Sequence, residues 1–125
     1  KDGIYAASLL VEMIAVTGKR LSEIIKEIEA QYGAISMEEH DYHFSNEKKA
    51  EIRKVLLEEK RIPELPFKID HVSYLDGSKV YFENGGWVIA RFSGTEPLLR
   101  IFAEMPDTAD AAKVVKLYED FLGLK

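Results

Sequence analysis

The 125-residue chain contains no cysteine. This absence excludes a disulfide framework and any metal site built from thiolates. No stretch approaches the roughly 18 apolar residues of a membrane span, and no secretory signal pattern is present, so a cytoplasmic protein without membrane contact is predicted. Basic residues are outnumbered, because 17 Lys and Arg face 22 Asp and Glu and give a net charge of −5. That balance argues against nucleic acid, which attracts basic surfaces.

The composition is otherwise that of a soluble globular protein, with 46% hydrophobic and 31% charged residues. The length predicts one domain with a modest core. The chain starts at Lys1-Asp2-Gly3 without an initiating Met, which is typical of a piece excised from a longer protein.

Two helices are predicted in the first third of the chain. Apolar residues recur at three- and four-residue spacing after Asp2, a plausible N-cap, and Thr17-Gly18 ends this pattern. A second apolar stripe runs from about Leu21 to Tyr32, and Gly33 closes it. We interpret the helical pair as a core-packing element that carries no site.

Residues 34–44 are predicted to form a strand. The residues expected to face the sheet's packed side are Ile35, Met37, Tyr42 and Phe44. The intervening Glu39, His40, Asp41 and His43 are potential metal ligands, but side chains alternate along a strand, which places the two histidines on opposite faces. We therefore interpret the charges as a solvated sheet edge and predict no metal site.

The rest of the chain predicts an α+β sandwich. Ser45 is a good N-cap for a helix to about Lys60, and prolines mark a connector over residues 62–66. Short strands follow at 69–75, 80–82, 87–92 and 98–103, with strong turn signals at Asp76-Gly77 and residues 84–86. A last helix is expected over 109–122. His71 is interpreted as a packing or surface residue, with Asp70 on the opposite face of its strand.

The most informative stretch is Arg91-Phe92-Ser93-Gly94-Thr95-Glu96-Pro97, followed closely by Arg100. Guanidinium groups match the oxygens of a phosphate, hydroxyls add donors, and a glycine lets the backbone turn and approach an anion closely. Ordinary turn chemistry beside a surface ion pair is the plainer alternative. On a strand starting at Leu98, Arg100 shares a face with Phe102, so its head must emerge at the loop end.

This string resembles the phosphate-binding loop of the α-D-phosphohexomutases, the phosphoglucomutases and phosphomannomutases, with Phe92 where that family usually has proline. Further similarity lies in Lys1–Ala7, which looks like the start of the last helix of the family's third domain. Leu75-Asp76-Gly77 and Gly86-Trp87 look like parts of its fourth domain. The resemblance thus covers nearly the whole chain in register, but only the final part of a full-length mutase.

The resemblance implies a division of labour. A phosphohexomutase interconverts hexose 1-phosphate and hexose 6-phosphate through a bisphosphate intermediate that turns over between two transfers. The C-terminal domain has a fold like that of the TATA-box-binding protein, and its loop holds the phosphate that is not being transferred. The resemblance assigns Arg91, Ser93, Gly94, Thr95 and Arg100 to this phosphate. The fold analogy also suggests DNA binding, with which the acidic charge balance disagrees.

The sequence shows none of the family's remaining machinery. It contains neither the phosphoserine loop nor the Asp-Gly-Asp-Gly-Asp string for Mg²⁺, which is expected in the missing part of the enzyme. We therefore expect residues 1–35 to be the helical end of the preceding domain plus a hinge. Residues 36–125 are expected to be the C-terminal phosphate-binding domain, without catalytic residues and inactive when isolated. Its partners would be the sugar substrate, the bisphosphate and the other mutase domains. The alternative is a stand-alone module that binds phospholigands or proteins.

Overall fold

A computed structural model describes residues 2–94 and 96–124, and the chain divides into two compact units, Lys1–Ala34 and Ile35–Lys125. The first unit holds helices α1, Gly3–Thr17, and α2, Leu21–Tyr32. The side chain of Asp2 accepts a hydrogen bond from the Tyr5 amide at 2.9 Å, and Gly18 ends α1 with a φ of 66°. Both helices and the capping role of Asp2 are therefore confirmed.

The interpretation of α1 and α2 as core-packing helices is wrong for this chain. No described residue of either helix is buried, and Ile4 and Val16 are 84% and 80% exposed. Periodicity shows that a helix has an apolar face, but it does not show what covers that face.

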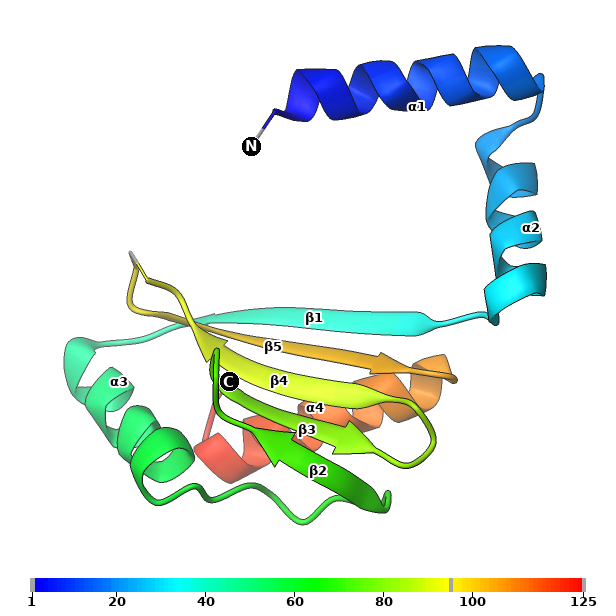
Figure 1. Cartoon of the computed structure of the whole chain (residues 1–125). Coiled ribbons are helices and arrows are strands. Elements are labelled where there is room, and N and C mark those ends of the chain that lie inside the picture. Colours follow the sequence, from blue (N-terminus) through cyan, green and yellow to red (C-terminus); the bar gives the residue numbers. More distant parts are fainter. Residues whose placement is uncertain (1, 95, 125) are drawn as a thin grey trace. The chain divides into compact units, whose positions relative to one another are not determined.

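The second unit is built on a five-stranded antiparallel sheet in the order β1-β5-β4-β3-β2 (Figure 1). The strands are β1 Ser36–His43, β2 Ile69–Ser73, β3 Ser78–Phe82, β4 Trp87–Phe92 and β5 Leu98–Met105. Helix α3, Asn46–Arg53, continues into a π-helical turn η1, Lys54–Glu58, and α4 spans Thr108–Leu122. The predicted α+β class is confirmed.

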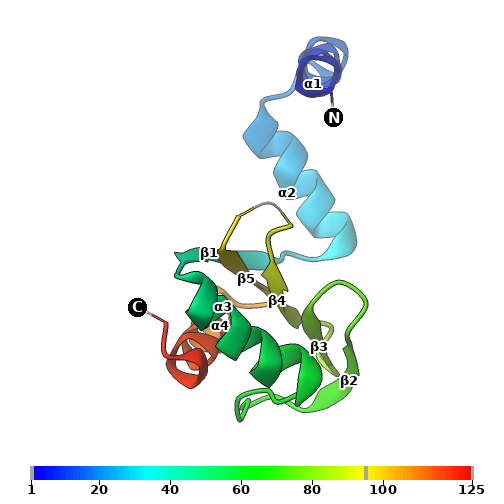
Figure 2. The same cartoon turned by 90° about the vertical axis from the view of Figure 1, so that its left-hand side faces the viewer.

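The core lies on one face of this sheet. Alternate residues of the three central strands are fully buried, and they pack with Ile52 and Leu56 of α3 and η1 and with Val114 and Tyr118 of α4. Figures 1 and 2 show α3 and α4 on the same side of the sheet. The opposite face, which we call the outer face, carries Arg91 and Arg100, and both are exposed.

β1 is an edge strand, as its charges predicted, but the expectation that Met37 faces inward is wrong. Its inner positions are the half-buried Ser36, Glu38, His40 and Tyr42, whereas Met37 is 56% exposed. His40 Nδ1 lies 2.8 Å from a carboxylate oxygen of Glu119 on α4, and the Tyr42 hydroxyl donates to the same oxygen. Tyr42 and Phe44 pack against the core as expected, and polar contacts with α4 take the place of apolar packing at the other inner positions of the strand.

Charge interactions reinforce this contact. The hydrogen bond with Glu119 raises the pKa of His40, and the hydrogen bond with Glu38 raises it further. Burial lowers the pKa, but its effect is smaller than that of Glu119. Burial alone would raise the pKa of Glu119, but hydrogen bonds from Tyr42, His40 and Lys116 hold it below its usual value. Burial and the same carboxylate raise the pKa of Tyr42. We call Glu38, His40, Tyr42 and Glu119 the His40 cluster, and its hydrogen bonds join β1 to α4.

One local expectation about β2 is also wrong. Asp70 was expected on the face opposite His71, yet its carboxylate lies 2.7 Å from His71 Nδ1. The pairing with β3 shifts register between Ile69 and His71, and such a bulge breaks the alternation of side chains. The His71 ring stacks on Tyr81 at a centroid distance of 4.3 Å, which fits the packing or surface role predicted for it.

Candidate functional site

The loop between β4 and β5 is anchored by backbone hydrogen bonds. The Ser93 amide donates to the Leu98 carbonyl and the Leu98 amide to the Glu96 carbonyl, both at 2.8 Å. The Phe44 amide, just after β1, donates to the Pro97 carbonyl at 3.3 Å. The Lys49 ammonium lies 3.5 Å from the Glu96 carbonyl oxygen. The flanks of the loop are therefore fixed to the sheet and to α3.

Arg91 and Arg100 lie side by side. They are direct partners in the pairing of β4 with β5, and partners in an antiparallel pair share a face of the sheet. Their side chains are 53% and 44% exposed, so both guanidinium groups are accessible from solvent. The strand register thus brings together two cations that stand nine positions apart in the sequence and flank the same loop.

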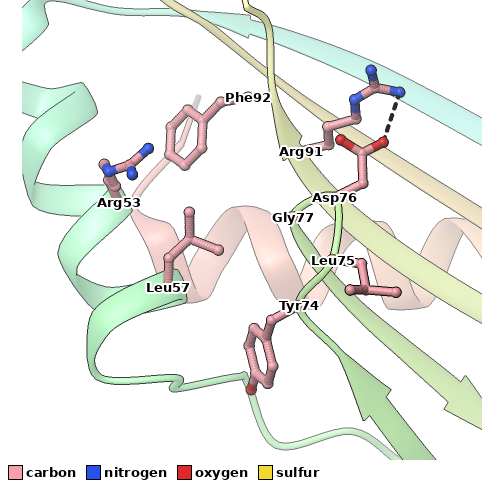
Figure 3. A pocket seen from close by; sticks show the side chains of 8 residues that line it. All are labelled: Arg53, Leu57, Tyr74, Leu75, Asp76, Gly77, Arg91 and Phe92. Carbon is pink, nitrogen blue, oxygen red and sulfur yellow. Dashed lines mark ion pairs between the residues drawn. The ribbon is translucent and has the colours of Figure 1, made fainter.

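Each of these arginines has a carboxylate partner on the side away from the other. Arg100 is opposite Asp41 in the pairing of β5 with β1, and its Nε lies 3.5 Å from Asp41 Oδ1. Arg91 Nη1 lies 3.2 Å from Oδ2 of Asp76, in the turn between β2 and β3 (Figure 3). The outer face therefore carries a row in the order Asp41, Arg100, Arg91, Asp76, which we call the charge row.

The turn that carries Asp76 fits closely against β4. Gly77 has a φ of 108°, and a Cβ atom added to it would lie 2.6 Å from the Ala90 carbonyl oxygen and 3.1 Å from the Arg91 Cα. The first distance is far below any normal contact, and the backbone conformation is one that only glycine adopts readily. A glycine at this position therefore allows the turn to bring Asp76 to Arg91.

A cavity of about 290 Å³ opens beside Arg91 (Figure 3). Arg53 of α3 lies across it from the Arg91–Asp76 pair, and apolar side chains form much of the remaining wall. Its lining residues are Arg53, Leu57, Tyr74, Leu75, Asp76, Gly77, Arg91 and Phe92. The surroundings of Arg91 thus include a second guanidinium and a small apolar hollow.

The predicted phosphate-binding residues come together in part. Arg91, Ser93 and Arg100 lie around one loop, and Thr95 lies outside the described residues. Gly94 is exposed, and its φ is outside the left-handed region; among the described residues other than its chain neighbours, none has an atom within 4 Å of an added Cβ. The backbone of Gly94 itself is therefore not in a conformation that favours glycine.

Sequence reasoning missed the two carboxylates of the charge row. The Leu75-Asp76-Gly77 motif was a signal for one of them, but its contact with Arg91 depends on strand register. Within residues 2–94 and 96–124, no group of three or more His, Asp or Glu side chains is arranged to hold a metal ion. In the same ranges no helix has the length and apolar content needed to cross a membrane.

Comparison with known proteins identifies the family. Residues 13–118 match the model of the phosphoglucomutase/phosphomannomutase C-terminal domain. A phosphoglucomutase/phosphomannomutase of Thermococcus kodakarensis is 36% identical over 94% of this chain and 23% of its own length. A probable phosphoglucosamine mutase of Methanosarcina acetivorans is 39% identical over 92% of this chain and 25% of its own length.

A phosphopentomutase of Thermococcus kodakarensis is also similar, at 32% identity over 84% of this chain and 22% of its own length. The chain therefore spans about a quarter of the length of these relatives. The family model covers most of the chain and includes every residue of the charge row. On this match the chain belongs to the phosphoglucomutase/phosphomannomutase family, of which it represents the C-terminal domain.

Proposed function

We propose that this chain is the phosphate-clamp domain of a phosphohexomutase, in which residues 91–100 hold the phosphate that is not being transferred. The observation that carries the proposal is the pairing of Arg91 with Arg100 at the base of an accessible loop. The carboxylate partners of the two arginines lie on the outer sides of the pair, so one phosphate can contact both guanidinium groups. They offer the donor geometry that suits phosphate oxygens.

The residues of the clamp act by binding and positioning. Arg91 and Arg100 donate charge-assisted hydrogen bonds to the phosphate, and the hydroxyls of Ser93 and Thr95 add donors. Exposed Gly94 lets the ligand approach the backbone closely. Holding the distal phosphate orients the far end of the sugar for transfer elsewhere in the enzyme. The phosphoserine and Mg²⁺ belong to the parts of the enzyme outside this chain.

The names of the relatives support recognition of phosphate rather than of one sugar. They refer to glucose, mannose, glucosamine and pentose phosphates, which share a phosphate but differ in the ring. A clamp of guanidinium, hydroxyl and amide donors reads only that shared group. We therefore propose that a hexose phosphate and its bisphosphate are the ligands, and that the preferred sugar is selected outside this domain.

The test is a titration of the chain with glucose 6-phosphate, followed by the shifts of its backbone amides in NMR spectra. We expect shifts clustered at residues 91–100 and a dissociation constant of about 1 mM, roughly 4 kcal/mol, because the rest of the clamp is missing. Arg91→Ala should weaken binding about tenfold or more, because charge-assisted hydrogen bonds contribute about 1.5–3 kcal/mol.

Arg61→Ala is the matched control, because it removes the same charge from an exposed position that pairs with Glu59. It should leave the affinity nearly unchanged. Shifts that cluster outside residues 91–100, or a folded Arg91→Ala variant that binds as well as the wild type, would refute the phosphate clamp.

A further inference from the structure

The proposed phosphate clamp uses the two arginines of the charge row, and its two carboxylates, Asp41 and Asp76, have no part in it. Asp41 and Asp76 flank the arginine pair on its two outer sides, at 3.5 Å from Arg100 and 3.2 Å from Arg91. We infer that these carboxylates are built-in counter-ions, which lower the affinity of the clamp for phosphate and receive the two guanidinium groups when the phosphate leaves. This inference rests on the proposed function.

The backbone fixes where both carboxylates stand. Asp41 is held by the β1–β5 register, directly opposite Arg100. Asp76 is held by the β2–β3 turn, whose Gly77 fits against the backbone of Ala90 and Arg91 with no room for a side chain. Neither carboxylate depends on a long flexible side chain to reach its arginine. The pairs therefore re-form readily whenever the site is free of anion.

The same placement makes the pairs easy to displace. The side chains of Asp41 and Asp76 are 39% and 68% exposed, and ion pairs at such positions are weak because water and salt screen them. A phosphate dianion carries more charge than a carboxylate and offers three acceptor oxygens. It can therefore occupy the centre of the row and draw the guanidinium groups away from Asp41 and Asp76.

A bound dianion nevertheless feels both carboxylates. At a separation of roughly 7 Å in a water-like dielectric, one carboxylate weakens the binding of a dianion by about twofold to threefold after screening by salt. Two carboxylates on opposite sides act nearly independently, so together they should weaken binding by about fivefold. The two carboxylates of the charge row thus lower the affinity for phosphate and speed its dissociation.

Ready release suits a reaction in which the sugar bisphosphate turns over between two transfers. The clamp must hold one phosphate, let it go, and then hold the other. Two arginines without counter-ions would be left as an uncompensated pair each time the phosphate left, which raises the free energy of the empty site. Asp41 and Asp76 lower that free energy and so favour dissociation.

The experiment uses the 125-residue chain and glucose 6-phosphate as the probe. Affinity and dissociation rate are measured from amide shifts and line shapes for the wild type, Asp41→Asn, Asp76→Asn and the double variant. Asn keeps the size of Asp and removes its charge. Asp76→Ser, which removes the charge with a smaller side chain, checks that the result is not caused by the amide.

Each single substitution should lower the dissociation constant about twofold to threefold, and the double variant about fivefold, with slower release. Asp70→Asn, which removes an exposed carboxylate that pairs with His71, is the matched control and should change nothing. Unchanged or weaker binding in the Asp41 and Asp76 variants would overturn the inference, since weaker binding means that the carboxylates orient the arginines. If neither the wild type nor the double variant shows shifts at residues 91–100, the phosphate clamp itself fails.

Discussion

Replacing Gly77 with alanine should destabilise the sheet unit, whereas replacing Gly94 with alanine should not. At position 77 the new methyl group would meet the Ala90 carbonyl oxygen at 2.6 Å and the Arg91 Cα at 3.1 Å, with φ at 108°. Backbone atoms cannot move aside as a flexible side chain can. Strain of this kind and the displacement of the turn together cost about 2–4 kcal/mol.

Gly94 provides the matched substitution. No described residue beyond its chain neighbours has an atom within 4 Å of its added Cβ, and its φ is outside the left-handed region. Gly94→Ala should therefore change the free energy of unfolding by less than about 0.5 kcal/mol. Urea and thermal unfolding can be followed by the fluorescence of Trp87, the single tryptophan, which lies in β4. A loss of 2–4 kcal/mol in a unit of this size lowers the midpoint by roughly 10–20 °C.

Equal stability of the two variants would refute the assignment of Gly77 as a residue that the packing of the turn requires. The Gly77→Ala variant should also bind phosphate with the same affinity as the Asp76→Asn variant, if the fit of the turn against β4 is what holds Asp76 beside Arg91. Both substitutions remove the carboxylate from Arg91, because a displaced turn takes Asp76 away from it.

Two further predictions concern the His40 cluster and catalysis. Because contact with Glu119 raises the pKa of His40 above its ordinary value of 6.5, protonated His40 stabilises the fold below that pH, and the contribution is lost as the pH rises through the higher folded value. His40→Gln should therefore lower the free energy of unfolding at pH 6 by less than about 1 kcal/mol, since the side chain is 42% exposed, and should match the wild type at pH 9 in chemical denaturation. The isolated chain should show no mutase activity with glucose 1-phosphate, Mg²⁺ and a bisphosphate activator; turnover that persists after removal of contaminating host enzyme would contradict the assignment of catalysis to other domains.

The sequence specified the local elements well where a cap or a turn residue marks them. Asp2, Gly18 and Gly33 bound the first two helices, and β4 was predicted with the bounds that the structure shows. The polar inner face of β1 was not predictable, because Glu119, which satisfies it, lies on the last helix. Hydrophobic alternation cannot indicate a buried side that is polar.

The same limit applied to the candidate site. The loop motif identified Arg91 and Arg100, but their direct pairing follows from the register of β4 with β5. Their acidic partners come from β1 and from the β2–β3 turn, which are distant in the sequence. A single sequence contains no signal for which carboxylate will meet which guanidinium. It also gave no indication that α3 would continue into a π-helical turn.

The position of β1 in the sheet has a consequence for the order of folding. Strands β2 to β5 pair with their neighbours in the sequence, so short loops bring them together. Strand β1 pairs only with β5, in a register that runs from His43 opposite Leu98 to Ser36 opposite Met105, and it cannot pair until β5 has formed. Closing that large loop is entropically slow, and an unpaired strand is exposed to association with other chains during the delay. The carboxylates of Glu38, Glu39 and Asp41 make such association unfavourable. The polar residues of β1 therefore also protect this strand from association with other chains until β5 has formed.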